Sequence, residues 1–127
     1  MIIVGNKYIQ CDSFVSVDSI DEIQNTPSNS TLIFSYDLEI MSYCFSNKLP
    51  YAIYISDITE AIFGNNLGAK YLITGKTHSF EVQKVAENYM FDSKVLVVIE
   101  GDAMIEDIAK NGIDGVIYNK FLEGLKK

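Results

Sequence analysis

Residues 68–76 read GAKYLITGK and residues 112–120 read GIDGVIYNK. Each stretch has a glycine that suits the end of a helix, then an unbroken apolar run, and then a lysine. An apolar run without alternation is typical of a strand that is covered on both faces, as in a parallel sheet. Both stretches therefore predict the end of a helix followed by a buried parallel strand.

The same pattern extends along the whole chain. The apolar runs are FVSV at 14–17, TLIFS at 31–35, YAIYI at 51–55, KYLIT at 70–74, KVLVVI at 94–99 and GVIY at 115–118. Between them, apolar residues at three- and four-residue steps predict short amphipathic helices. Their stripes are Leu38, Met41 and Phe45; Ile58, Ala61 and Ile62; Val82, Val85, Ala86 and Tyr89; and Ile105, Ile108 and Ala109. Strand–helix–strand units this close together need right-handed crossovers. We therefore predict one α/β domain of residues 1–127, a three-layer α/β/α sandwich with a mainly parallel sheet of five to seven strands, flavodoxin-like or receiver-like.

Local signals refine this prediction at the ends of the elements. The run IIV at 2–4 adds a seventh strand, and the turn residues Gly5 and Asn6 can fold it into an edge hairpin with Tyr8 and Ile9. Helix starts are predicted at Asp57 with Glu60, at Ser19 with Glu22, and at His78 or Ser79 near Glu81. Gly68 and Gly112 are expected to end helices, and Pro50 to begin a strand.

The two opening stretches belong to a longer internal similarity. Sliding residues 51–76 forward until Lys76 overlies Lys120 aligns YAIYIS with VLVVIE and Gly68 with Gly112, without a gap. Any two strand–helix units of one sheet share a helix-ending glycine and a buried aliphatic strand. We favour that general explanation over a duplication.

Composition narrows the class of protein. The chain has 127 residues, a formal charge of −7 and 48% hydrophobic residues, which predicts an acidic globular domain that folds alone. A negative protein is poorly suited to nucleic acid or anionic lipid. The N-terminus lacks the features of a signal peptide, and no apolar run approaches membrane-spanning length, so a cytoplasmic location is expected. Cys11 and Cys44 are expected to be free thiols, with Cys44 packed on the apolar side of its helix.

In an open α/β sheet, ligands bind beyond the carboxyl ends of the strands. The candidate ligand-binding residues at those positions are Asp37, Ser56, Asp57, Lys76, His78, Glu100 and Lys120. Carboxylates, a hydroxyl, lysines and the single histidine suit a small polar or phosphorylated ligand. The same residues also suit helix capping and solvated loops, so both interpretations stay open.

The segment TGKT at 74–77 has the tail of a phosphate-binding P-loop, with a strand before it and a helix after it. The full motif needs a glycine where this chain has Lys70, which argues against nucleotide hydrolysis and leaves a lone phosphate as an alternative. No histidine or cysteine lies at metal-ligand spacing, so no metal site and no cofactor is predicted.

Residues 50–76, PYAIYISDITEAIFGNNLGAKYLITGK, resemble the fourth strand, fourth helix and fifth strand of response-regulator receiver domains. The resemblance implies that Ser56 matches the switch hydroxyl, that Lys76 matches the lysine on the phosphoryl group, and that Asp37 lies near the phosphoacceptor. The acidic pair that holds Mg²⁺ after the first strand is absent, since Asn6 and Lys7 follow MIIVG. The resemblance therefore implies the architecture without phosphorelay chemistry.

Three functional hypotheses follow. The first is a non-catalytic regulatory or protein-interaction module, and the many aromatic residues favour a protein partner or self-association. The candidate dimer surface is a helix at 80–91 with Phe80, Tyr89, Met90 and Phe91, although the same residues can instead cover the sheet. The second is a ligand-binding protein or enzyme, in which Lys76 or Lys120 binds an anion and Asp37, Asp57 or Glu100 moves a proton. The third is a fragment of a (βα)₈ barrel that completes itself by association. Converging side chains in a pocket would favour an enzyme, whereas carboxylates bonded to helix N–H groups would favour a module.

Overall fold

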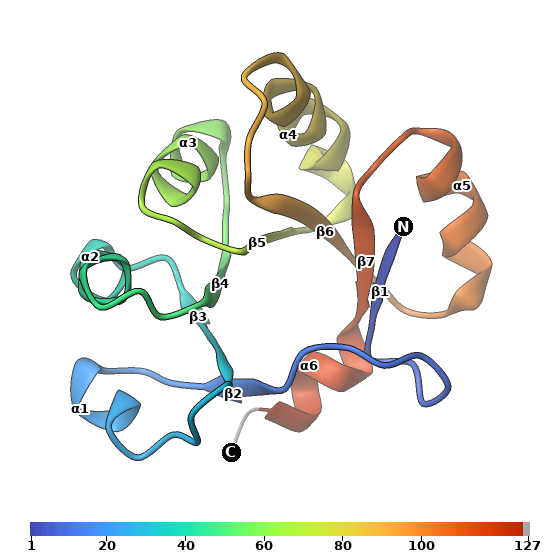
Figure 1. The fold of residues 1–127 in the computed structure, drawn as a ribbon. Coiled ribbons are helices and arrows are strands. Elements are labelled where there is room, and N and C mark those ends of the chain that lie inside the picture. Colours follow the sequence, from blue (N-terminus) through green and yellow to red (C-terminus); the bar gives the residue numbers. More distant parts are fainter. Residues whose placement is uncertain (126–127) are drawn as a thin grey trace.

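Parallel strands form one curled sheet in the computed structural model, which describes residues 1–125 (Figure 1). The strands are β1 (Ile2–Val4), β2 (Phe14–Ser16), β3 (Thr31–Ser35), β4 (Tyr51–Tyr54), β5 (Tyr71–Thr74), β6 (Lys94–Ile99) and β7 (Gly115–Tyr118). Their order in the sheet is β1-β7-β6-β5-β4-β3-β2, and every neighbouring pair is parallel. The described residues thus contain seven strands, the upper end of the predicted range.

Helices cover the two faces of the sheet unequally. They are α1 (Ile20–Ile23), α2 (Leu38–Ser46), α3 (Ile58–Asn66), α4 (Lys76–Asn88), α5 (Ile105–Lys110) and α6 (Asn119–Leu125), with a 3₁₀ turn η1 at Asp102–Met104. Helices α1 to α5 share one hydrophobic cluster on the convex face, and α6 contributes to the other cluster on the concave face. Figure 1 shows the first five as an arc outside the strands, with α6 between β2 and β7.

The predicted α/β class, the layering and the parallel sheet are confirmed. Four strands, β1, β3, β6 and β7, have the predicted bounds. Strands that are covered on both faces are written as unbroken apolar runs, which makes their ends visible in the sequence. The second helical layer is α6 alone. Strands β2 to β7 lie side by side in chain order, an order that (βα)₈ barrels also use, but here the sheet stays open between β1 and β2.

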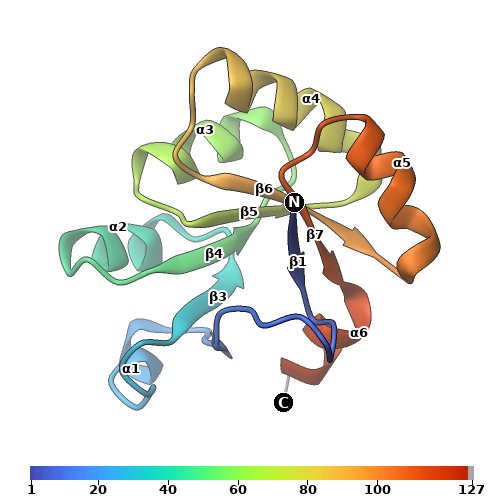
Figure 2. The ribbon, with the colours of Figure 1, turned by 45° about the vertical axis from the view of Figure 1, so that its right-hand side comes forward.

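Helix α6 fills the opening between the two edges of the sheet. It contacts β7, which it follows in the chain, and β2 on the other side of the opening (Figure 2). Leu122 of α6 is buried, and Phe121 and Leu125 pack on the same concave cluster. The Phe121 ring lies edge-on to Phe14 of β2, with centroids 5.9 Å apart. An apolar helix therefore takes the place of a direct pairing between β1 and β2.

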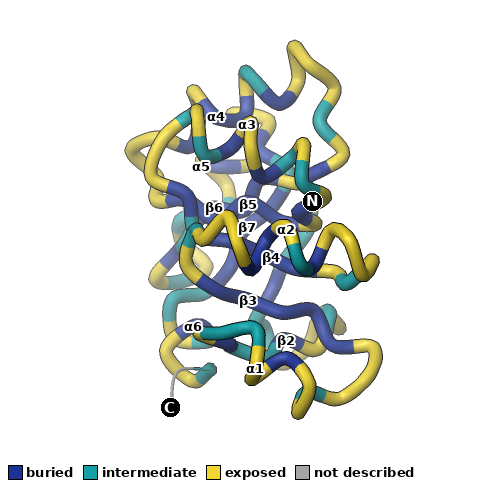
Figure 3. The backbone as a smooth tube through the Cα atoms, turned by 90° about the vertical axis from the view of Figure 1, so that its left-hand side faces the viewer, coloured by how far each residue is buried: buried dark blue, intermediate teal, exposed yellow. Residues whose placement is uncertain are grey.

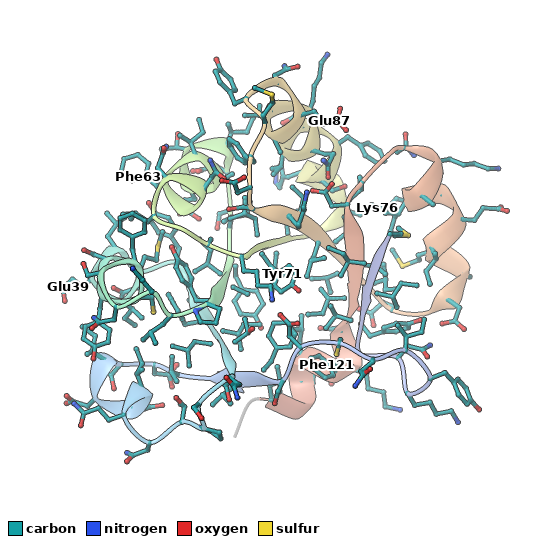
Figure 4. The ribbon with its side chains drawn as sticks, in the orientation of Figure 1. Glu39, Phe63, Tyr71, Lys76, Glu87 and Phe121 are labelled. Atoms are coloured by element: carbon teal, nitrogen blue, oxygen red, sulfur yellow. The ribbon has the colours of Figure 1, made fainter. Side chains whose placement is uncertain are left out.

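Aromatic side chains fill the rest of the concave face. Phe14 also packs on Tyr71 of β5, with ring centroids 5.8 Å apart. Figure 4 shows Tyr71 pointing into the space that the sheet encloses, toward α6 and Phe121. Ile33, Leu96 and Ile117 complete this inner cluster from β3, β6 and β7. The interior of the curl is a packed core.

The convex face buries fewer of the predicted stripe residues than expected. Met41, Ala61 and Ile108 are fully buried under their helices. Phe45 and Tyr89, also placed in stripes, are 55% and 73% exposed. These helices are short and lie on a curved sheet, so only one or two residues per turn reach it, and helical spacing alone could not identify the outermost members. Figure 3 shows the strands buried and the outer sides of the helices exposed.

The predicted N-terminal hairpin is wrong, although β1 does lie at an edge of the sheet. Ile2, Ile3 and Val4 pair in parallel with β7. Residues 5–13 form turns and irregular chain that cross to β2, and Tyr8 is exposed. Gly5 has a φ of 100° and lies against Phe121, where an added Cβ would come within 2.6 Å of the Phe121 Cβ. Pairing with a strand distant in sequence has outweighed the local turn signal.

Two of the three predicted helix starts are confirmed. The Asp57 carboxylate accepts from the Glu60 N–H at 2.8 Å, and the Ser19 hydroxyl accepts from the Glu22 N–H at 3.4 Å. The start near His78 is wrong, because α4 begins at Lys76 with Gly75 as its N-cap. Gly68 and Gly112 have φ angles of 80° and 72° directly after the C-caps of α3 and α5, as expected of glycines that end helices. No helix among the described residues has the length and apolar character needed to cross a membrane.

Gly115 allows β7 to lie between β6 and β1. A Cβ at this position would lie 2.5 Å from the Ile2 carbonyl oxygen and 2.8 Å from the Leu96 Cδ2. The first contact is with backbone, which cannot rotate away. Any side chain here would push β1 from the edge of the sheet.

We expect Gly115→Ala to lower the free energy of unfolding by about 1–3 kcal/mol, the usual cost of overpacking a core. Urea unfolding followed by circular dichroism would measure it. Gly124→Ala is the matched control, because no heavy atom lies within 4 Å of the Cβ it adds and alanine favours a helix. Equal stability of the two variants would contradict the close packing of β7.

Candidate functional site

The seven residues predicted from the strand ends all lie at or just beyond the carboxyl edge of the sheet. Two of them cap helices: Asp37 accepts from the N–H groups of Glu39 and Ile40 at 3.0 and 3.2 Å, and Asp57 caps α3. Ser56 is exposed, and its N–H donates to the Glu60 carboxylate at 2.8 Å. These polar groups hold the starts of α2 and α3.

The remaining predicted residues are exposed and lie on separate elements. Lys76 forms an ion pair of 3.1 Å with Asp107 of α5, while His78 lies in the first turns of α4 (Figure 4 labels Lys76). Glu100 follows β6, and Lys120 lies in the first turn of α6. The structure brings Ser56 and Asp57 together with Glu60 at one helix start and does not gather the seven residues into one pocket.

A cleft lies at the same edge, nearer β2. It has a volume of about 670 Å³. The residues that line it are Val15, Ser16, Val17, Asp18, Glu22, Asn25, Thr26, Phe34, Ser35, Tyr54 and Leu125. They come from the ends of β2, β3 and β4, from α1 and the turn after it, and from the last described residue of α6. None of the seven predicted residues lines it.

The sequence contained a signal for this cleft that the prediction did not use. Ser16 and Asp18 follow the apolar start of the run at 14–17, as Asp37 follows the run at 31–35. The rule that ligands bind beyond the carboxyl ends of strands applies to both runs. The capping pair Ser19 and Glu22 predicted the start of α1, but a single helical turn leaves no periodic pattern that would show which side of it lines the cleft.

The cleft combines hydroxyl and amide groups with two carboxylates on an apolar floor. Ser16, Ser35 and Thr26 offer hydroxyls, and Tyr54 offers a phenol whose pKa is raised by burial. Glu22 accepts from the Asp18 N–H at 3.3 Å, whereas the Asp18 carboxylate is exposed and has no partner among the described residues. The described lining includes no lysine, arginine or histidine. Its electrostatic character is negative.

The first turn of α4, where the sequence suggested a phosphate site, lies outside this cleft. Gly75 provides no side chain to cap the helix, and no acidic residue lies in the first turn. The charge of Lys76 is already compensated by Asp107. Among the described residues, no group of three or more His, Cys, Asp or Glu side chains converges as a metal site would require. Cys44 is packed as expected, and burial raises the pKa of its thiol to about 11.

A second polar cluster lies at the opposite, amino edge of the sheet. The Asp12 carboxylate accepts from Lys70 Nζ at 2.6 Å, from the Tyr71 hydroxyl at 3.1 Å and from the Thr31 hydroxyl at 3.1 Å. These partners lie at the starts of β3 and β5. Asp12 therefore binds the segment 5–13, which crosses from β1 to β2, to the amino edge of the sheet. Burial raises the pKa of Tyr71 to about 12, and the neighbouring Asp12 carboxylate adds to that shift. This cluster stabilises the fold at the edge away from the cleft.

Comparison with models of known protein families and with curated proteins gives no match to this chain. The site is therefore interpreted from its own geometry.

Partial burial of Asp12 opposes its ionisation, but the hydrogen bonds from Lys70, Tyr71 and Thr31 and the Lys70 charge outweigh this effect and lower the pKa below 3.8. A depressed carboxyl pKa contributes stability above the pKa of the unfolded chain, and this contribution is lost as pH falls through the folded pKa. We expect Asp12→Asn to lower the free energy of unfolding by about 1 kcal/mol at pH 7 and by less at pH 3. Urea unfolding at both pH values would measure the difference.

Asp92→Asn is the control, because Asp92 is exposed and has no partner among the described residues. Its stability should follow that of the original protein at both pH values. If Asp12→Asn has the same free energy of unfolding as this control at both pH values, the cluster at the amino edge contributes nothing to stability.

Proposed function

We propose that this chain is a non-catalytic binding module that holds a small polar ligand in the cleft at the carboxyl ends of β2, β3 and β4. The observation that carries the proposal is the cleft itself. Its volume of about 670 Å³ falls within the range of about 300–1,000 Å³ that is usual for small-molecule sites. Its position at the carboxyl edge is also where open α/β sheets bind ligands.

The lining favours a neutral or cationic ligand that carries hydroxyl or amine groups. Asp18 can accept hydrogen bonds from such groups, and Ser16 and Ser35 can donate or accept. Val15 and Leu125 offer apolar surface to a carbon skeleton. A phosphate or carboxylate would face Asp18 and Glu22 without a compensating cation among the described lining residues. The phosphorylated ligand considered from the sequence is therefore left out of this proposal.

The carboxylates at the other strand ends support binding rather than catalysis. Asp37 and Asp57 accept hydrogen bonds from helix N–H groups, the arrangement expected of a module whose acidic residues position helices. The resemblance of residues 50–76 to receiver domains supports a regulatory role through shared architecture. Phosphotransfer is not part of the proposal, because Asn6 and Lys7 stand where receiver domains have the acidic pair that holds Mg²⁺.

Contact with another protein is the second candidate function. The observation that favours it is a group of exposed apolar side chains on neighbouring helices, Phe45 on α2 and Ile62 and Phe63 on α3. Exposed aromatic residues are enriched where proteins meet. A regulatory module needs both a signal and a partner, so the two candidate functions are compatible.

A thermal-shift and calorimetry panel of amino sugars, polyols and polyamines, each beside a phosphorylated or acidic counterpart, tests the cleft. We expect an uncharged or cationic member to stabilise the protein, because only a ligand that binds the folded state raises its stability. Asp18→Asn should raise the dissociation constant of that ligand roughly tenfold or more, because one charge-assisted hydrogen bond is lost.

Asp21→Asn is the matched control, because Asp21 is an exposed carboxylate of the same helix region that does not line the cleft. The Asp21→Asn variant should bind the ligand with the same affinity as the original protein. Binding of phosphorylated members alone, abolished by Lys76→Ala, would move the site to the first turn of α4. No binding by any member would overturn the ligand proposal.

A further inference from the structure

Strand β2 forms one edge of the sheet, and two hydrogen bonds show which of its backbone groups are paired. The Thr31 N–H donates to the Ser13 carbonyl at 2.8 Å, and the Val17 N–H donates to the Ile33 carbonyl at 3.1 Å. In an extended strand, the N–H and C=O groups of successive residues point alternately to its two sides. The odd-numbered positions of β2 therefore face β3, and the even-numbered positions face the opening of the sheet.

The two even-numbered positions, Phe14 and Ser16, differ in what lies beside them. The Phe14 ring packs edge-on against Phe121 of α6, so the helix covers that part of the edge. Ser16 is half-buried and lines the cleft. Its N–H and C=O have no hydrogen-bond partner in the part of the chain that the structure describes. The cleft thus adjoins one unpaired position of a strand.

The cleft does not reach the other free edge of the sheet. The Ile2 N–H donates to the Asp114 carbonyl at 2.9 Å, so Ile3 is the residue of β1 whose backbone faces the opening. No residue of β1 lines the cleft. Of the edge positions in residues 1–125 that face the opening, Ser16 is the one that borders the cleft.

A negative charge lies close to this unpaired position. Asp18 follows Ser16 by two residues, and its exposed carboxylate has no partner among residues 1–125. An extended chain advances about 3.4 Å per residue. A cation bonded to Asp18 and an amide bonded to Ser16 can therefore belong to neighbouring residues of one extended ligand.

We propose that the cleft binds the free N-terminus of a short peptide, which adds to β2 as an antiparallel strand. The terminal ammonium binds Asp18, and the second residue of the peptide exchanges both N–H···O=C bonds with Ser16, as hydrogen-bonded pairs of antiparallel strands do. A peptide parallel to β2 would place its C-terminal end, rather than its ammonium, beside Asp18. The inference rests on the ligand cleft proposed above and names the class of its ligand.

The two faces of the sheet determine which side chains the peptide needs. Phe14 belongs to the concave cluster, and Val15 and Val17 pack on the convex one, so the Ser16 side chain faces the concave side. The second residue of the peptide lies opposite Ser16 and faces the same side, where Leu125 lines the cleft. An apolar second residue fits this surface. Because α6 covers the edge at Phe14, only about two or three residues can pair.

Titration of the isotope-labelled full chain with the tripeptide amide Ser-Val-Ala, followed by NMR, tests the proposal. Methylation of the valine nitrogen removes the N–H that donates to the Ser16 carbonyl, so it should raise the dissociation constant about tenfold or more. Methylation of the alanine nitrogen is the matched control, because the N–H of the third residue points away from β2 and its loss should leave the affinity unchanged. Acetylation of the N-terminus removes the ammonium and should also weaken binding about tenfold.

Protein variants and hydrogen exchange test the same two contacts from the other side. Asp18→Asn should weaken the free-amine peptide about tenfold and leave the acetylated peptide unchanged, because only the first carries the ammonium. Asp21→Asn, an exposed carboxylate outside the cleft, should bind both peptides as the original protein does. Peptide binding should slow the exchange of the Ser16 N–H, whereas the Val17 N–H is already bonded to Ile33 and should exchange slowly throughout.

Three results would overturn this inference. If no peptide binds while an amino sugar, polyol or polyamine does, the peptide class is wrong and the ligand cleft stands. If neither peptides nor the other compounds bind, the ligand cleft is wrong as well. Equal loss of affinity on methylation at either nitrogen, or binding without slower exchange at Ser16, would show that the peptide does not pair with β2.

Discussion

The packing that fills the concave face controls the shape of this protein. A curled parallel sheet with two free edges needs apolar material inside the curl, and here α6 and the aromatic residues Phe14, Tyr71 and Phe121 supply it. The fit is close at Gly5, beside Phe121 of α6, and at Gly115 of β7, since neither glycine has room for a Cβ. Because α6 also contributes Leu125 to the cleft, the same packing that sets the curl sets one wall of the candidate site.

The two ends of the strands carry different kinds of polar groups. At the amino edge, side chains bind backbone or one another: Asp12 binds Lys70 and Tyr71, and Asp114 accepts from the Val95 N–H at 2.9 Å. These contacts connect segments that are far apart in sequence, so they stabilise the fold. At the carboxyl edge, Asp37 and Asp57 accept hydrogen bonds from the first N–H groups of the helices that follow them. The cleft at this edge is lined by side chains that carry hydroxyl groups. The polar groups of the cleft thus lie at strand ends and around α1, where the sheet positions them.

Sequence reasoning succeeded where a structural requirement is local and failed where it is not. The runs at 31–35 and 94–99 identified their strands, because burial on both faces demands unbroken apolar residues. Gly5 and Asn6 suggested a hairpin, but β1 pairs with β7, at the other end of the chain. Phe45 has the helical spacing of a core residue, and only the tertiary structure shows that it faces solvent. The strand-end rule selected the edge of the sheet at which the cleft lies, yet the cleft lies at β2, which the candidate residues left out.

The cleft and the helices α2 and α3 are built on the same two strand–helix units. Ser35 ends β3 and lines the cleft, and two residues later Asp37 caps α2; Tyr54 ends β4 and lines the cleft, and Asp57 then caps α3. A ligand that contacts Ser35 and Tyr54 therefore acts within one turn of the helices that carry Phe45 and Phe63. A ligand in the cleft and a protein bound to the outer surfaces of these helices would therefore affect each other's affinity by the same factor, since coupling between two binding sites is reciprocal. Because the covalent connection is short, such coupling would require only the movement of a helix against the sheet.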